Sequence, residues 1–229
     1  MDNNQISKFL EFAEKANEAG SEILLKHFSN VRALEKWKKS DDGLVTNADI
    51  ESDNAIGTIL SQSKIRILSE ESTSGLNESN LTWLVDPLCG TMPFSTGMPH
   101  WGLNIALRFD QRLLLSVVSL PYFSEIFVSI LGRGVTLNGE TLECKTPTKN
   151  LSDGIIGLEI DGGEEWKKLL PKKLSWLTAV NQVNTFASAA YPITQVCQGR
   201  LAAVVFYGVE PVHIAAGALL ATELGLKVT

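Results

Sequence analysis

The chain has 229 residues, of which 44% are hydrophobic and 20% are charged, and its 20 Lys and Arg against 26 Asp and Glu give a net charge of −6. This length corresponds to one large domain or two closely joined lobes with a sizeable core. The composition excludes a disordered or collagen-like chain. The acidic balance argues against a non-specific nucleic-acid binder but is compatible with a small phosphate held by metal ions.

Targeting signals and disulfides are not indicated. The longest unbroken apolar run, Leu201–Tyr207, is far shorter than the ~20 residues that a membrane-spanning helix needs. The N-terminus begins with polar residues and lacks the basic flank and apolar stretch of a secretory signal. Three cysteines, Cys89, Cys144 and Cys197, are an odd and sparse set for a disulfide scaffold. We therefore expect a cytoplasmic protein with reduced thiols and no membrane contact.

The first third of the chain predicts two helices and two strands. Apolar residues recur at spacings of three and four over 6–24, which indicates an amphipathic helix, and a second helix is expected over Ser52–Leu60. A short strand over 65–68 runs into Glu70, and a second strand, Leu81–Val85, stops on Asp86. We expect the two strand ends to deliver their carboxylates to neighbouring places.

The middle of the chain has the pattern of an antiparallel meander. The β-rich runs Trp101–Phe109, Leu113–Leu120 and Glu125–Ile130 are separated by turn residues. Asn138 and Gly139 then stand between strand-like flanks, and this dipeptide is a strong signal for a two-residue hairpin.

The character of the sequence changes after about residue 150. Short strands at Gly154–Glu159, Leu177–Val180 and Leu201–Tyr207 alternate with helices at Ser188–Gln198 and Val212–Leu224, which indicates an α/β arrangement.

This change in pattern predicts two lobes. The first is an N-terminal α+β lobe over 1–150, and the second is a C-terminal α/β lobe over 151–229. The last residues, Gly225–Thr229, look like the entry to a further strand, and we expect the chain to stop early.

Three segments carry the residues that phosphoryl chemistry needs. Metal-assisted hydrolysis of a phosphate ester requires hard oxygen ligands and an ion that lowers the pKa of a water molecule. Glu70 follows one strand, Asp86 follows another, and a third segment over 210–217 opens a late helix. Pro87 frees the Leu88 carbonyl as a ligand, and the next residues present backbone N–H groups and a hydroxyl to a phosphate.

These segments resemble the inositol monophosphatase family, and the match covers most of the chain in the right order. The resemblance implies a Mg²⁺-dependent phosphomonoesterase, commonly dimeric, with the layered α-β-α-β-α sandwich of the inositol monophosphatase and fructose bisphosphatase type. Its last strands and helix would be missing here. The motifs that carry the resemblance are Lys38 with Leu44–Asp49, then Trp83–Thr91, Gly132–Gly134 with Asn138 and Gly139, Ala187–Ala190, and His213–Gly217.

The resemblance also implies roles for individual residues. Metal ligands would be Glu70, Asp86 and the Leu88 carbonyl. Catalysis would involve Glu70 together with Thr91, which pairs with Asp49 to orient the attacking water. The substrate would be bound by four residues, namely Gly90, Thr91, Ser188 and Ala189.

Two departures from the family pattern concern the second metal site. The family has an Asp where this chain has Cys89, and another where it has His213, while Phe206 replaces an acidic residue that grips the substrate. Mg²⁺ favours oxygen ligands in octahedral geometry, so a second Mg²⁺ should bind poorly. Thiolate and imidazole suit Zn²⁺, so Asp86, Cys89 and His213 are a candidate Zn²⁺ site. The alternative is a site that has lost two ligands, with Cys89 an ordinary buried thiol.

Two functions therefore stay open from the sequence. One is metal-dependent hydrolysis of a small phosphomonoester with weakened activity, because an ion that neutralises the leaving oxygen contributes several kcal/mol. The other is a catalytically inactive homologue that binds a phosphorylated metabolite or a partner subunit. In both cases the expected partners are a small phosphorylated metabolite and a second copy of the chain, without nucleic acid or membrane.

Overall fold

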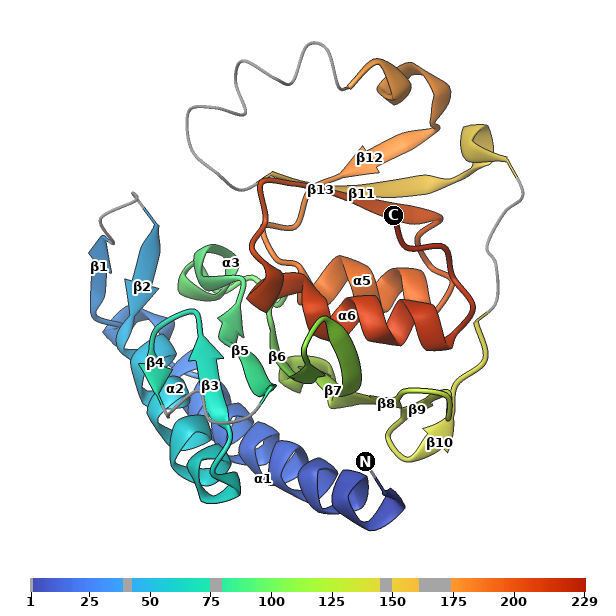
Figure 1. Ribbon diagram of the computed structural model, residues 1–229. Helices are drawn as coiled ribbons and strands as arrows, with labels where there is room; N and C mark the ends of the chain where they lie inside the picture. Colours follow the sequence, from blue (N-terminus) through green and yellow to red (C-terminus); the bar gives the residue numbers. More distant parts are fainter. Residues whose placement is uncertain (1, 39–42, 75–79, 145–149, 161–173) are drawn as a thin grey trace.

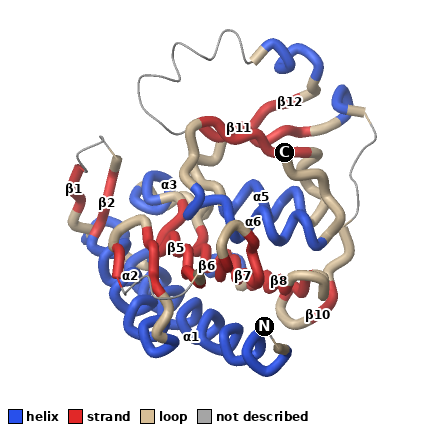
Figure 2. The backbone as a smooth tube through the Cα atoms, viewed as in Figure 1, coloured by secondary structure: helices blue, strands red, loops and turns tan. Residues whose placement is uncertain are grey.

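The computed structural model describes residues 2–38, 43–74, 80–144, 150–160 and 174–229. These residues form successive layers, in which two helices cover one face of a large sheet and two further helices lie between that sheet and a small one (Figures 1 and 2). The predicted layered sandwich is confirmed. The lobe boundary near residue 150 stays a prediction.

Five α-helices are described. The first has a capping box in which the Asp2 carboxylate accepts the Gln5 N–H, and it is longer at both ends than the predicted 6–24. The helix bounds are α1 Asn3–Phe28, α2 Asn47–Leu60, α3 Thr91–Ser95, α5 Ala190–Cys197 and α6 Pro211–Glu223.

The large sheet contains the predicted meander and hairpin. Its strands pair in the order β10-β9-β8-β7-β6-β5-β3-β4, and every pair is antiparallel except β3 with β5. Asn138 and Gly139 both have positive φ, 51° and 83°, as the predicted hairpin requires. The bounds are β3 Arg66–Ser69, β4 Thr73–Ser74, β5 Leu81–Cys89, β6 Gly102–Phe109, β7 Arg112–Leu120, β8 Glu125–Ile130, β9 Val135–Leu137 and β10 Glu140–Thr141.

The small sheet is parallel, in the order β12-β11-β13, with bounds β11 Ile155–Ile160, β12 Gln182–Asn184 and β13 Ala203–Tyr207. The predicted strand at Leu177–Val180 is wrong, because Ser175–Ala179 forms a 3-10 helix and the strand that pairs with β11 comes after it. The predicted strand at Gly225–Thr229 is also wrong, because these residues lie outside any strand. A separate antiparallel ribbon joins β1 Lys36–Lys38 to β2 Leu44–Thr46.

Strand β5 is the centre of the core. Trp83 and Val85 pack into the cluster under α1 and α2, whereas Leu84 packs into the cluster under α5 and α6. This alternation follows from the two-residue period of a strand, and it explains why β5 is apolar on both faces. The strand continues past its predicted end at Asp86, and its register with β6 shifts between Asp86 and Cys89, where Pro87 has no N–H to donate.

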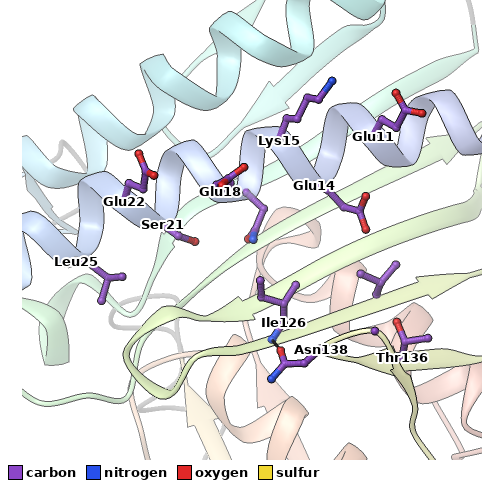
Figure 3. Close-up of a pocket in the computed structure, with 13 residues that line it drawn as sticks. Glu11, Glu14, Lys15, Glu18, Ser21, Glu22, Leu25, Ile126, Thr136 and Asn138 are labelled. Atoms are coloured by element: carbon purple, nitrogen blue, oxygen red, sulfur yellow. Dashed lines mark hydrogen bonds between the residues drawn. The ribbon is translucent and has the colours of Figure 1, made fainter.

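A groove lies between α1 and strands β8 and β9 (Figure 3). Four of the eight α1 residues that line it are glutamates, and its opposite wall is formed by apolar and small polar residues. None of the predicted site residues is among its lining residues, which are Glu11, Glu14, Lys15, Asn17, Glu18, Ser21, Glu22, Leu25, Ile126, Val128, Thr136, Asn138 and Gly139. In the part of the chain that the structure describes, no helix is long and apolar enough to cross a membrane.

The close approach of β6, β7 and α5 at Gly102 leads to a stability prediction. A Cβ at Gly102 would lie 2.5 Å from the Ser119 carbonyl oxygen and 2.8 Å from the Ala190 Cβ. We expect Gly102→Ala to lower the free energy of unfolding by about 1–3 kcal/mol, measured by urea denaturation. Gly57 in α2 is the matched control, because a Cβ there meets nothing within 4 Å.

Gly57→Ala should raise the free energy of unfolding by about 0.5–1 kcal/mol, since alanine is the better helix former. Equal effects of the two substitutions would contradict the packing described at Gly102.

Candidate active site

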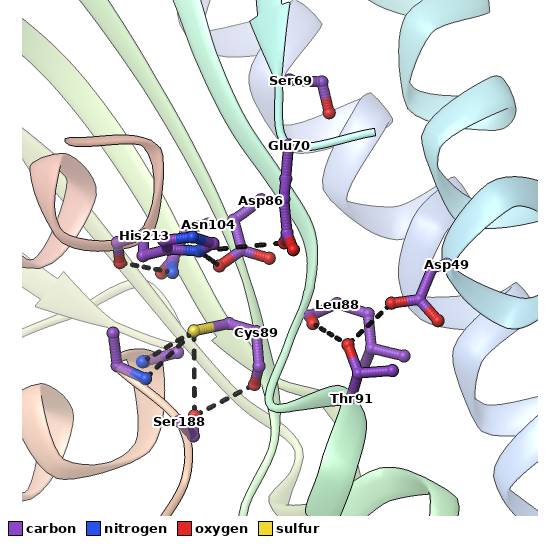
Figure 4. A network of polar contacts seen from close by, with 12 residues as sticks. Asp49, Ser69, Glu70, Asp86, Leu88, Cys89, Thr91, Asn104, Ser188 and His213 are labelled. Carbon is purple, nitrogen blue, oxygen red and sulfur yellow. Dashed lines mark hydrogen bonds and ion pairs between the residues drawn. The ribbon is translucent and has the colours of Figure 1, made fainter. Parts of the chain in front are cut away.

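The parallel pairing of β3 with β5 brings Glu70 and Asp86 together. Ser69 pairs with Val85, and the Glu70 N–H donates to the Val85 carbonyl at 3.1 Å, so Glu70 and Asp86 follow paired residues at the same end of the two strands. Figure 4 shows the two carboxylates facing each other. Ligand atoms of Glu70, Asp86 and His213 all lie within 4.8 Å of one another. The expected convergence of the strand ends is therefore present.

His213 enters this group from the first turn of α6. Its Nδ1 donates to Asp86 Oδ2 at 2.7 Å and lies 3.8 Å from Glu70 Oε2. The Asn104 side-chain amide donates to the His213 carbonyl oxygen at 2.9 Å, which ties α6 to strand β6. Asn104 was not predicted from the sequence, because nothing local marks a contact between residues 109 positions apart.

The Cys89 thiol lies near the Asp86 carboxylate and contacts the start of α5. Its Sγ accepts the N–H groups of Ala189 and Ala190 at 3.1 and 3.2 Å (Figure 4). Burial raises the pKa of the Cys89 thiol well above its usual value, and the nearby Asp86 carboxylate raises it further. The metal-capable group found among the described residues is Glu70, Asp86 and His213, without Cys89. A Zn²⁺ site of Asp86, Cys89 and His213 stays a prediction.

Asp49 and Thr91 form the expected pair. The Thr91 hydroxyl donates to Asp49 Oδ1 at 2.8 Å, and the Thr46 hydroxyl and N–H donate to Oδ2 at 2.6 and 2.8 Å. Burial raises the pKa of Asp49 to about 6, against the lowering effect of these hydrogen bonds. Thr46 and Asp49 also form the capping box of α2, so this helix begins at Asn47, five positions before the predicted Ser52.

Two neighbouring polar side chains of α2 support the metal-capable group, and sequence reasoning missed both. The Ser52 hydroxyl donates to the Pro87 carbonyl at 2.9 Å. The Asp53 carboxylate accepts the hydroxyls of Ser69 and Ser72 at 2.5 and 2.6 Å, on either side of Glu70. Ser52 and Asp53 follow Asp49 at spacings of three and four, which places the three polar residues on one face of α2, and this spacing was the available signal.

Gly90 allows the segment that contains Ser188 and Ala189 to pack closely against the end of β5. It has φ of 109°, and a Cβ there would lie 2.9 Å from the His100 carbonyl oxygen and 3.0 Å from Ser188 Cβ. The Ser188 hydroxyl donates to the Cys89 carbonyl at 3.0 Å. Ser188 and Ala189 are therefore beside Gly90 and Thr91, whereas their contact with a substrate stays a prediction.

The donors fit one divalent cation. Asp86 is fully buried, and its Oδ1 has no hydrogen-bond partner among the described residues, which is costly unless another group binds it. Two carboxylates and the Leu88 carbonyl are the oxygen donors that Mg²⁺ prefers. The third side chain of the group, His213, offers nitrogen instead.

Comparisons with known proteins agree with this fold. The model of the inositol monophosphatase family matches residues 5–229. A Pasteurella multocida protein named Nus factor SuhB is 29% identical over 96% of this chain and 84% of its own length. The inositol monophosphatase of Dictyostelium discoideum is 30% identical over 98% of this chain and 85% of its own. The crystal structure of the extragenic suppressor protein suhB from Bartonella henselae has a TM-score of 0.86 at 24% identity, covering 95% and 85% of the two chains.

The fold and the carboxylate group thus define a phosphatase-type layered sandwich. The chain belongs to the inositol monophosphatase family.

The buried carboxyl of Asp49 predicts a pH dependence of stability. Its pKa rises from 3.8 to about 6 on folding, so the folded chain binds a proton more tightly than the unfolded one. Ionisation of Asp49 therefore weakens the fold as the pH rises from about 4 to 6. In the metal-free protein, we expect Asp49→Asn to become more stable relative to wild type by about 2 kcal/mol between pH 4.5 and 7.

Urea unfolding in the presence of a chelator measures this difference at each pH. Groups common to both proteins cancel, so a difference that stays constant with pH would contradict the buried titration of Asp49.

Proposed function

We propose that the protein hydrolyses a small phosphomonoester with Mg²⁺. The observation that carries this proposal is the convergence of Glu70, Asp86 and His213 within 4.8 Å, next to the hydrogen-bonded pair of Thr91 and Asp49. Membership of the inositol monophosphatase family supports the reaction class. Glu70, Asp86 and the Leu88 carbonyl would hold the ion. The chemistry that Mg²⁺ supplies when bound is a lowered pKa of a water molecule and withdrawal of electron density from the phosphoryl group.

The remaining residues would orient the reactants. The Thr91 hydroxyl commits its proton to Asp49 at 2.8 Å, so its oxygen lone pairs are available to accept a hydrogen from the attacking water. The backbone N–H groups of Gly90 and Thr91 would bind phosphate oxygens, and Ser188 with Ala189 would line the substrate side. These roles rest on the positions of the residues beside the carboxylate group.

Activity is expected to be weaker than a two-metal site provides. The imidazole of His213 reaches into the donor group, and Cys89 offers a neutral thiol because burial raises its pKa. A second Mg²⁺ would therefore lack carboxylate ligands, and the leaving oxygen would lack the positive charge that stabilises it.

A non-catalytic role is the second candidate. His213 already donates to Asp86 at 2.7 Å, and this contact satisfies part of the charge that a metal ion would otherwise balance. Several bacterial relatives carry the name Nus factor SuhB. Under this alternative the chain binds a phosphorylated metabolite or a partner subunit without turning it over.

Restoring the carboxylates tests the catalytic proposal. We expect Cys89→Asp with His213→Asp to raise Mg²⁺-dependent phosphate release at least about tenfold, because the second ion would then have ligands. Aspartate at position 89 would meet the N–H groups of Ala189 and Ala190, which suit a carboxylate. Calorimetry should report one Mg²⁺ for wild type and two for the double variant.

Cys144→Asp is the control, because it makes the same thiol-to-carboxylate change at a partly exposed position outside the metal-capable group. Its rate and stoichiometry should match wild type. If wild type releases no phosphate above a metal-free blank and the double variant does not improve on it, the non-catalytic alternative holds.

We also propose that the chain forms a homodimer in the cytoplasm. An apolar surface supports the dimer, since the side chains of Tyr122 and Phe123 are 53% and 41% exposed. The centroids of their two rings are 5.3 Å apart.

Light scattering should give twice the mass of the chain. Phe123→Lys should shift the protein toward monomer, whereas Phe109→Lys, at another exposed phenylalanine on the end of β6, should not. A monomeric wild type would contradict the dimer.

A further inference from the structure

A buried glutamate lies outside the metal-capable group and has no role in the reaction described above. Glu159 is on strand β11 and is 6% exposed. Its two carboxylate oxygens accept two successive backbone N–H groups, those of Phe186 at 2.8 Å and Ala187 at 2.9 Å. Burial raises the pKa of Glu159 to about 7, while the N–H groups of Phe186, Ala187 and Ser188 lower it. These donors stabilise the ionised form against the cost of burial.

The segment that Glu159 holds does not have an intrinsically favoured backbone. Ala187 has φ of 52°, in the left-handed region that costs a residue with a Cβ about 1–2 kcal/mol. Charge-assisted hydrogen bonds to N–H groups are stronger than neutral ones, so the carboxylate offsets this cost. Without it, the segment would relax toward a conformation that places its N–H groups elsewhere.

The other end of the same segment is held by Cys89. The N–H groups of Ala189 and Ala190 donate to Cys89 Sγ, and the Ser188 hydroxyl donates to the Cys89 carbonyl. Residues 186–190 are thus anchored on one side to the small sheet, through Glu159, and on the other to the end of β5. Ser188 lies between the two anchors, and its Cβ would be 3.0 Å from a Cβ placed on Gly90.

We propose that Glu159 is a positioning residue that holds residues 186–190 in the conformation that binds the substrate. This inference rests on the proposed function, in which Ser188 and Ala189 line the substrate side. Glu159 acts through the backbone of the segment and does not touch the reacting atoms. A carboxylate is required because both of its oxygens are acceptors, whereas a carboxamide has one acceptor oxygen and turns an NH₂ group toward a second N–H.

Hydrogen exchange of the whole chain tests the anchoring without any activity. At pH 8, where Glu159 is ionised, Glu159→Ala should exchange the amides of residues 186 and 187 at least about tenfold faster than wild type. Glu159→Gln should fall between the two, because it keeps one acceptor. Glu140→Gln, the same change at an exposed position in β10, should leave this segment unchanged. The proposal would be overturned if the amides of residues 186 and 187 exchanged at the wild-type rate in Glu159→Ala. If the alanine variant does not fold, the same result in Glu159→Gln would overturn it.

Kinetics then separate positioning from simple destabilisation. Glu159→Gln should raise the KM for the phosphomonoester about tenfold and leave kcat within about twofold, because the lost contacts bind ground state and transition state alike. A merely unstable variant would lose active enzyme and therefore kcat, with KM unchanged, and that result would also overturn the proposal. If wild type has no phosphatase activity, the proposed function fails, and binding of inorganic phosphate replaces KM. Equal phosphate affinity in wild type and Glu159→Gln would then reject the positioning role.

Discussion

The candidate site depends on hydrogen bonds between the buried face of α2 and the two segments that carry Glu70, directly after β3, and Asp86, near the end of β5. Asp53 accepts two serine hydroxyls that flank Glu70, and Ser52 donates to the carbonyl of Pro87, directly after Asp86. Two carboxylates so close to each other repel, and neither would keep its position on a loose turn. Because one rigid helix fixes both segments, the two carboxylates stay close together despite their repulsion. Their combined negative charge can then attract a cation.

The single parallel pair in the large sheet explains why these segments meet. In an antiparallel pair the loop after one strand lies beside the beginning of its neighbour. Because β3 and β5 run in the same direction, their C-terminal ends lie at the same end of the sheet, where α2 packs beside α1 against β5. The rest of the sheet, a simple meander, supplies the buried platform against which α5 and α6 pack.

Much of this arrangement was predictable from local sequence. The helix, meander and hairpin patterns were confirmed, and the run from Trp83 to Thr91 marked the segment that contains Asp86 and the turn after β5. The misplaced strand at Leu177–Val180 came from a short apolar run, because short runs of this kind suit a strand and a 3-10 turn equally well. The direction of the Cys89 thiol and the two hydrogen bonds accepted by the Glu159 carboxylate were not predictable. The N–H donors lie about 100 positions from Cys89 and about 27 positions from Glu159.

The contact between Asp86 and His213 spans 127 positions of the chain and joins the central sheet to the last described helix. The group of Glu70, Asp86 and His213 is therefore complete only when α6 is packed against the large sheet. Loosening α6 would withdraw the imidazole and leave two neighbouring carboxylates without it, so the docking of this helix and the charge of the site are coupled.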